Sequence, residues 1–195
     1  MEIADVGALV LAGGHSQRMG MDKKALLWNG KTFLDSLAET IRLAGLHPLL
    51  VSTNRPVPGY DTLSDEQENL GPLEGIRCGL KAAQTRKIMI LPVDIPQIPA
   101  ALIRAIVKQA IETDAAFTAL SHDGFVEPLI SVADRSLLPE IEKLMKSGCF
   151  RALMLRELGT YSIFEYTGDL DRIKSINLPE EYESLGENFN ALSKR

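Results

Sequence analysis

The sequence has few of the residues that usually mark a zinc site, a disulfide framework or a nucleophilic triad. Only two cysteines occur, Cys78 and Cys149, and neither lies in a Cys-x-x-Cys pair or at zinc-ligand spacing from a histidine. We interpret both as small packing residues. No Ser or Cys stands in a recognisable triad setting. The histidines are scattered along the chain as His15, His47 and His122, and we interpret them as solvated or loop residues.

Long apolar runs and an excess of positive charge are also absent. No apolar run reaches the length needed to span a bilayer, and the first residues include Glu2 and Asp5 instead of a basic segment before an apolar one. The net charge of −5 argues against a general nucleic-acid-binding protein, which would be basic. We therefore expect a cytoplasmic protein without a membrane or nucleic-acid partner. The net charge does not exclude a nucleotide ligand, because one local cluster of cations is enough to bind it.

The composition is that of an ordinary globular protein, with 45% hydrophobic and 24% charged residues. A length of 195 residues is enough for one substantial α/β domain. No internal repeat, linker or low-complexity stretch is visible, so we expect one domain over residues 1–195. Residues 188–195 are polar and are expected to form a frayed tail.

Apolar runs alternate with amphipathic segments along the chain, which is typical of an α/β fold. Helices are expected at 33–44, 72–83, 101–112 and 150–158, and a loop at 56–69. A further helix, capped by Asp134 or Ser136, is expected to run through Met145. Strands are expected at 6–10, 48–53, 87–93, 115–120, 126–132 and 161–166. The order of these elements predicts a three-layer sandwich with a mostly parallel, Rossmann-like central sheet.

The stretch from Leu11 to Lys23, LAGGHSQRMGMDK, directly follows the first expected strand. Gly13 and Gly14 let the backbone turn sharply and approach a ligand closely. Backbone N–H groups in such a turn form an anion-binding concavity. Arg18 and Lys23 can add full charges, Arg by holding two phosphate oxygens and Lys as a compact point charge. These features predict a phosphate-rich ligand.

Polar residues stand where two further strands are expected to end. Asp94 follows the strand at 87–93, and a carboxylate beside a phosphate loop is a natural Mg²⁺ ligand, since Mg²⁺ takes one or two carboxylates with phosphate oxygens and water. Its alternative role is a helix cap or turn residue. Ser52 and Asn54 end the strand at 48–53, and ligands of open α/β sheets collect at such ends.

Residues 25–32, ALLWNGKT, match a relaxed Walker A pattern, which would make Lys31 the phosphate-binding residue of an ATPase. The residues Leu, Leu, Trp and Asn are poor material for a loop that must offer free N–H groups to phosphates. We interpret the segment as a short apolar stretch and a turn, with Lys31 solvated.

The Leu11–Lys23 stretch resembles the signature of the nucleotidyltransferases, in the branch that includes molybdenum cofactor guanylyltransferase. The pattern Leu-Ala-Gly-Gly-x-Ser-x-Arg-Met-Gly-x-Asp-Lys is complete here, and its fixed spacing makes it specific. Residues 93–96 also resemble the Val-Asp-x-Pro element that carries the metal in that family. The resemblance extends to about Glu181 and implies a fold of the nucleotide-diphospho-sugar transferase type.

The resemblance implies transfer of GMP from GTP to the phosphate of molybdopterin, with release of pyrophosphate. It assigns the α-phosphate to Lys23, the polyphosphate to Arg18 and Mg²⁺ to Asp94. Asp65 would help to recognise the guanine or its surroundings. The implied nucleotide-binding set comprises Leu11, Ala12, Gly13, Gly14, Lys23, Ser52, Asn54, Asp65 and Asp94.

Two residues are candidates for the acceptor side. Glu127 lies in a Glu-Pro-Leu segment that matches the family segment facing the acceptor, but it can equally be an ordinary polar residue at a strand start. Asn177 matches the second Asn of the family's closing Asn-x-Asn-x-Pro-Glu-Glu, with Ser175 in place of the first, but it can equally cap a helix. Apo-molybdoenzymes and a pterin-delivery protein are further partners that the resemblance suggests.

Ser52 stands where the guanylyltransferases often place an Asn that contacts the base. The nearest alternative function is therefore a CTP-dependent cytidylyltransferase acting on the same pterin, followed by a sugar-phosphate nucleotidyltransferase. A nucleotide-binding regulatory module without turnover is an alternative of a different class. The presence of Arg18, Lys23 and Asp94 together favours an enzyme.

Overall fold

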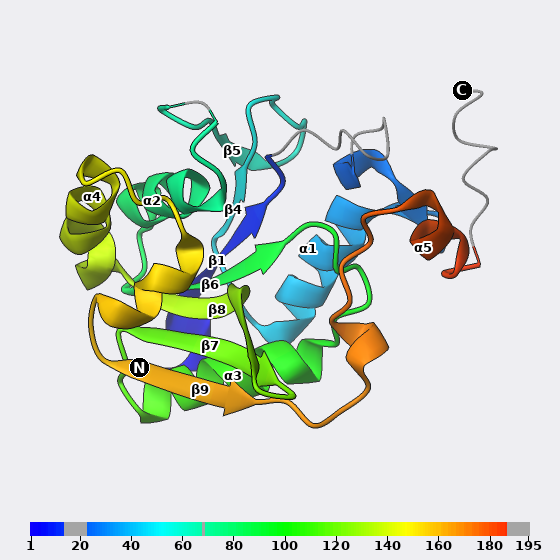
Figure 1. The fold of residues 1–195 in the computed structure, drawn as a ribbon. Coiled ribbons are helices and arrows are strands. Elements are labelled where there is room, and N and C mark those ends of the chain that lie inside the picture. Colours follow the sequence, from blue (N-terminus) through cyan, green and yellow to red (C-terminus); the bar gives the residue numbers. More distant parts are fainter. Residues whose placement is uncertain (14–22, 68, 187–195) are drawn as a thin grey trace.

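The computed structural model describes residues 1–13, 23–67 and 69–186 and is built around a seven-stranded sheet (Figure 1). The strand order is β5-β4-β1-β6-β8-β7-β9. In this sheet, β8 is antiparallel to β6 and β7, while the other paired neighbours are parallel. The strands are β1 (Val6–Leu11), β4 (Leu49–Ser52), β5 (Asp61–Leu63), β6 (Lys87–Pro92), β7 (Phe117–His122), β8 (Phe125–Asp134) and β9 (Tyr161–Glu165).

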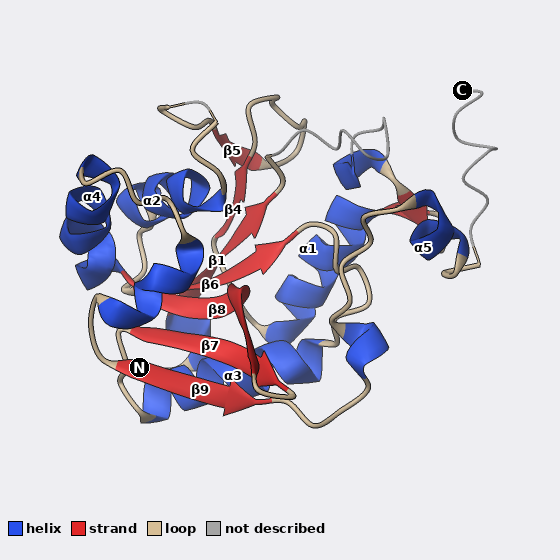
Figure 2. Ribbon diagram, in the orientation of Figure 1, coloured by secondary structure: helices blue, strands red, loops and turns tan. Residues whose placement is uncertain are grey.

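Helices cover both faces of this sheet, which confirms the expected three-layer, mostly parallel α/β architecture (Figure 2). One face packs against α1 (Phe33–Ala44) and α3 (Ala100–Glu112), and the other against α2 (Pro72–Ala82) and α4 (Leu138–Lys146). The remaining elements are the strands β2 (Leu27–Trp28) and β3 (Lys31–Thr32), the helix α5 (Pro179–Glu183), and 3₁₀ turns at Ile3–Asp5, Lys23–Ala25, Arg135–Leu137, Ala152–Glu157 and Leu170–Arg172.

The helix expected at 33–44 has these bounds in the structure because both of its ends are specified locally. The hydroxyl of Thr32 accepts a hydrogen bond from the backbone N–H of Asp35 at 3.0 Å, and Gly45 closes the helix with φ 87°. Two expectations were wrong. The loop at 56–69 contains the edge strand β5, and the helix at 150–158 is a 3₁₀ segment, Ala152–Glu157.

Helix α2 carries glycine where it crosses β1 and β4, which lets it pack close to these strands. A Cβ on Gly75 would lie 2.5 Å from the Ser52 hydroxyl, and one on Gly79 would lie 2.4 Å from a methyl group of Leu9. A side chain at either position would push the helix outward or force the strand residues to repack. The glycines therefore set how near the start of α2 comes to the carboxyl ends of the two strands.

Within the described ranges, no helix is both long enough and apolar enough to cross a membrane.

Candidate active site

The carboxyl ends of β1, β4, β6 and β7 meet at one edge of the sheet, because these four strands run in the same direction. Backbone pairing continues just past the strand ends. The N–H of Ala12 donates to the carbonyl of Ser52 at 2.8 Å, and the N–H of Val93 donates to the carbonyl of Leu11 at 3.1 Å. The segments that follow β1, β4 and β6 are thereby held side by side, with Gly13 exposed at the edge. Gly14 and Arg18 lie outside the described residues.

Lys23 and Asp94 form an ion pair at this edge, with 2.7 Å between Nζ and Oδ2. Each side chain is 16% exposed, so the pair is partly shielded from water but can still be reached by a ligand. The lysine comes from the end of the glycine-rich stretch and the aspartate from the turn after β6. Two of the three residues that the sequence assigned to catalysis are therefore in direct contact.

The second carboxylate oxygen of Asp94, Oδ1, is buried and accepts no hydrogen bond from the described part of the chain. Leaving such an oxygen unsatisfied is costly, so this atom fits the role of a cation ligand. Within the same ranges, no group of three or more His, Cys, Asp or Glu side chains is placed to hold a metal ion. The residues therefore suit a cation held by one carboxylate and completed by phosphate oxygens and water.

Asn177 reaches the same lysine from the opposite end of the chain. Its side-chain oxygen Oδ1 accepts a hydrogen bond from Lys23 Nζ at 2.5 Å. The neighbouring N–H of Ile176 donates to the backbone carbonyl of Asp94 at 2.8 Å. Lys23 is thus held by one charged and one neutral acceptor.

Two of the residues expected near the nucleotide base, Asn54 and Asp65, are joined by a hydrogen bond. Asn54 Oδ1 accepts a hydrogen bond from the backbone N–H of Asp65 at 3.0 Å, which fixes the start of the loop before α2. Ser52 is 3% exposed, and its hydroxyl lies against Gly75. Asn54 therefore shapes the loop that presents Asp65, while the buried Ser52 supports the strand end beneath it.

Glu74 holds the next part of this loop and was not singled out from the sequence. Its side chain is fully buried, and Oε1 accepts from the backbone N–H groups of Glu66 and Gln67 at 3.0 and 3.1 Å. Arg77 donates to both of its carboxylate oxygens at 2.8 Å. The hydrogen bonds from Arg77 lower the pKa of Glu74 from 4.5 to about 2, against the opposing effect of burial. In the sequence, the signal that could have identified this pair is the i, i+3 spacing of Glu74 and Arg77 in an otherwise apolar segment.

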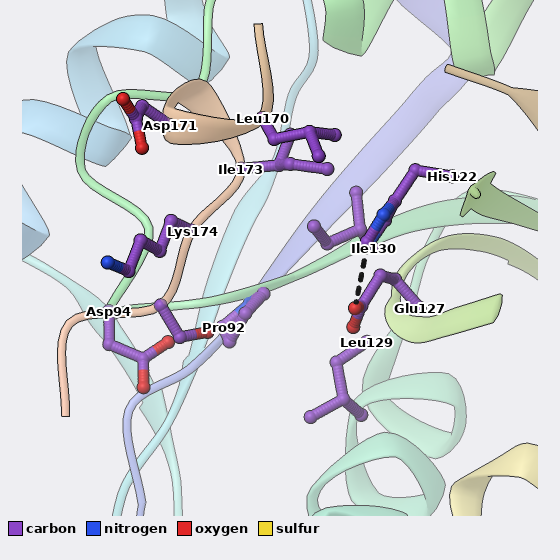
Figure 3. A pocket seen from close by; sticks show the side chains of 11 residues that line it. Pro92, Asp94, His122, Glu127, Leu129, Ile130, Leu170, Asp171, Ile173 and Lys174 are labelled. Atoms are coloured by element: carbon purple, nitrogen blue, oxygen red, sulfur yellow. Dashed lines mark hydrogen bonds and ion pairs between the residues drawn. The ribbon is translucent and has the colours of Figure 1, made fainter. Parts of the chain in front are cut away.

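A cavity of about 410 Å³ lies beside Asp94 (Figure 3). Figure 3 shows Lys174 next to Asp94, and the pair formed by His122 and Glu127 on the opposite side. The walls between these polar groups are largely apolar. The lining residues are Pro92, Asp94, His122, Glu127, Leu129, Ile130, Leu170, Asp171, Ile173, Lys174 and Ser175.

His122 departs from the expectation of a solvated or loop residue. It ends strand β7, its side chain is 21% exposed, and its Nε2 lies 3.2 Å from Glu127 Oε1. The antiparallel pairing of β7 with β8 is what brings the two residues together across the hairpin. Of the other two histidines, His47 is exposed and His15 lies outside the described residues.

Comparison with known proteins identifies the family. The model of the MobA-like NTP transferase domain matches residues 8–160. The chain belongs to this family. It is 35% identical over 180 residues to a protein of Pseudomonas fluorescens (strain Pf0-1) named molybdenum cofactor guanylyltransferase, covering 88% of this chain and 89% of that protein. As a MobA-like NTP transferase, the chain is a nucleotidyltransferase.

Solved structures of low sequence identity share the fold. The crystal structure of molybdopterin-guanine dinucleotide biosynthesis protein A from Archaeoglobus fulgidus has a TM-score of 0.78 at 18% identity, covering 97% of this chain and 100% of that one. A Mycobacterium tuberculosis protein, Rv0371C, solved in complex with manganese has a TM-score of 0.65 at 18% identity, covering 92% and 97%. These likenesses agree with the three-layer architecture of a MobA-like domain.

The segment with the relaxed Walker pattern has another structure in this MobA-like chain. Strands β2 and β3 form a hairpin, and the turn residues Asn29 and Gly30 have φ of 50° and 77°, as a two-residue type I′ turn requires. Lys31 is 54% exposed and forms an ion pair with Glu39 at 2.5 Å. The expected apolar stretch and turn are confirmed, and the hairpin leaves no phosphate-binding loop at residues 25–32.

Proposed function

We propose that the chain transfers GMP from GTP to the phosphate group of molybdopterin, giving the guanine dinucleotide form of the cofactor and pyrophosphate. The contact between Lys23 and Asp94, at the edge where the glycine-rich signature ends, is the observation that carries this proposal. The relative named molybdenum cofactor guanylyltransferase, at 35% identity over 88% of the chain, supports the choice of nucleotide and acceptor.

The reaction needs no nucleophile from the protein. A phosphate oxygen of molybdopterin is already anionic near neutral pH and would attack the α-phosphorus of GTP. The bond from this phosphorus to the bridging oxygen breaks, and pyrophosphate leaves with the bonding electrons. Catalysis then consists of positioning the two phosphates and neutralising the charge that builds on the α-phosphate oxygens. Lys23 would supply that positive charge from a partly buried position.

We assign a divalent cation, Mg²⁺, to Asp94, whose buried Oδ1 accepts no hydrogen bond within the described ranges. When bound, the cation would add positive charge at the phosphate oxygens. The M. tuberculosis protein of the same fold was solved in complex with manganese, which agrees with the use of a divalent ion in this fold. The chain's own contribution is to fix the carboxylate, through Lys23 at Oδ2 and the N–H of Ile176 at the backbone carbonyl.

The two substrates would occupy different sides of this pair. The backbone after β1 and the Asp65 loop would take the nucleotide, and the cavity lined by His122 and Glu127 would take the acceptor. The roles of Gly14 and Arg18 rest on the sequence signature and on the resemblance. A cytoplasmic location is a proposal from the composition of the sequence, and transfer to apo-molybdoenzymes and a pterin-delivery protein are proposals from the resemblance.

Pyrophosphate release tests the proposal when it is measured with each of GTP, CTP, ATP and UTP, first without an acceptor, then with molybdopterin, and then with a sugar phosphate. We expect release with GTP only when molybdopterin is present. Release with CTP instead would make the chain a cytidylyltransferase, and release only with a sugar phosphate would make it a sugar-phosphate nucleotidyltransferase. Nucleotide binding without release under any condition would identify a regulatory module.

A further inference from the structure

The last described segment of the chain returns to the active site and closes around Lys23. Ile176 binds the backbone of Asp94, and Asn177 accepts a hydrogen bond from the lysine itself, across 154 positions of sequence. Asp94 and Asn177 therefore share one ammonium group. The amide of Asn177 is neutral, so it can orient the ammonium group without cancelling the charge that a phosphate needs.

Asn177 is held in turn by Glu181. The carboxylate oxygen Oε2 of Glu181 accepts from the backbone N–H of Asn177 at 2.7 Å and from that of Leu178 at 3.0 Å. These are N–H groups that precede or open helix α5 and have no partner within the helix. Both bonds close the turn from which the Asn177 side chain projects toward Lys23.

Helix α5 has five residues, too few to be stable alone, so its position depends on packing. Tyr182 supplies this packing. Its side chain is 1% exposed, its ring lies 6.0 Å from that of Phe33, and its hydroxyl donates to the backbone carbonyl of Leu27 at 2.6 Å. The helix is thereby fixed to the β2–β3 hairpin and to α1, which directly follow Lys23 in the sequence.

We propose that Glu181 is a positioning residue for Lys23 and acts through Asn177. The carboxylate fixes the turn at residues 177–178, the turn fixes the amide, and the amide fixes the ammonium group beside Asp94. The measurement of kcat in the variants rests on the proposed transfer of GMP. The measurement of Lys23 acylation needs no substrate and does not depend on that proposal.

The substitution Glu181→Ala removes both backbone contacts, and Glu181→Gln keeps an oxygen that can accept them. The matched control is Glu180→Ala, an exposed glutamate in the same turn of α5. A small misplacement of a reacting group costs up to about a hundredfold in rate, so we expect kcat to fall by about ten- to a hundredfold in Glu181→Ala. We expect Glu181→Gln to recover most of this loss, and Glu180→Ala to match the wild type. Equal kcat in Glu181→Ala and Glu180→Ala would overturn the inference.

The double variant Asn177→Ala/Glu181→Ala tests whether the two residues act in series. If Glu181 acts through Asn177, the double variant loses no more kcat than Asn177→Ala alone. Losses that multiply would show that Glu181 acts by another route. Thermal unfolding of each variant, compared with Glu180→Ala, separates a general loss of folded protein from a local effect.

Acylation of Lys23 by a small amine-reactive reagent, followed by peptide mass spectrometry, needs no substrate. Loss of the Asn177 contact should leave the Lys23 amino group held by Asp94 alone and raise the acylation rate several-fold in Glu181→Ala, with no change in Glu180→Ala. Unchanged acylation in Glu181→Ala would refute the positioning role. If the wild type transfers no nucleotide, but the acylation rate of Lys23 still rises in Glu181→Ala, only the proposed function is contradicted.

Discussion

The ammonium group of Lys23 lies 2.7 Å from a carboxylate oxygen of Asp94, although 71 positions separate the two residues in the sequence. The parallel pairing of β1 with β6 explains the contact, since it places the segments after both strands at one edge. A positive charge for phosphate and a carboxylate for a cation are thereby adjacent. The pair also leaves each charge compensated in the partly buried site.

Removing either member of this pair should abolish most transfer while the protein stays folded. We expect Lys23→Ala and Asp94→Ala each to lower kcat by about a hundred- to a thousandfold, because both groups act on charge that develops in the transition state. Pyrophosphate release measures kcat, and circular dichroism checks the fold. The control is Lys31→Ala, since Lys31 is solvent-exposed and pairs with Glu39. Transfer at the wild-type rate in Lys23→Ala or Asp94→Ala would remove that residue from the catalytic assignment.

Binding of Mg²⁺ to the protein should require the bound nucleotide. With one carboxylate available and no cluster of three ligands in the described ranges, the protein alone offers few ligands to Mg²⁺. We expect a chelator to abolish transfer and Mg²⁺ to restore it. In calorimetry, after subtraction of the heat of Mg²⁺ binding to free GTP, the protein should bind Mg²⁺ detectably with GTP present and not without it. Tight Mg²⁺ binding to the protein alone would contradict a site completed by phosphate oxygens.

Elements with local signals could be predicted from the sequence. The helix at 33–44 was correct at both ends because Thr32 and Gly45 specify its boundaries by their own chemistry. Strand β5 was not predicted, because its three residues Asp61–Leu63 form no alternating or apolar run and become a strand only by pairing with β4. An edge strand of this kind depends on its partner more than on its own residues.

The residues of the candidate site also differ in whether a local sequence pattern could predict them. The signature and the strand-then-aspartate pattern placed Lys23 and Asp94, because each feature is contiguous in sequence. Contacts made by tertiary pairing could not be foreseen, such as that of His122 with Glu127, which needs the register of the β7–β8 hairpin. The same holds for Glu74, whose buried position is set by the packing of α2 on the sheet.

The His122–Glu127 pair offers a test of the acceptor side. We expect His122→Ala and Glu127→Gln to raise the KM for molybdopterin by about tenfold and to leave the KM for GTP unchanged, since loss of one good polar contact costs roughly 1.5 kcal/mol. Steady-state kinetics with each substrate varied in turn makes the distinction. Lys108→Ala is the control, because Lys108 is 70% exposed on α3 and does not line the cavity. A raised KM for GTP instead would place the cavity on the nucleotide side.

The Glu74–Arg77 pair predicts a pH dependence of stability. Because the pKa of Glu74 falls from 4.5 to about 2 on folding, its contribution is present above pH 4.5 and is lost as the pH falls toward 2. This pKa shift corresponds to a contribution to the free energy of unfolding of about 3 kcal/mol at neutral pH and about 1 kcal/mol near pH 3. We therefore expect Glu74→Gln to lower the free energy of unfolding by this larger amount at pH 7, and by much less at pH 3, as measured in urea.

A surface pair of the same spacing provides the control for Glu74. Glu140 and Lys143 are also an i, i+3 pair, but their side chains are 45% and 70% exposed. Such pairs contribute at most about 1 kcal/mol, so Glu140→Gln should change stability little at either pH. Because Glu74 also binds the backbone of residues 66 and 67, its loss should loosen the Asp65 loop and raise the KM for GTP. A Glu74→Gln protein whose loss of stability is the same at pH 7 and pH 3 would mean that packing, and not the carboxylate charge, is what this position supplies.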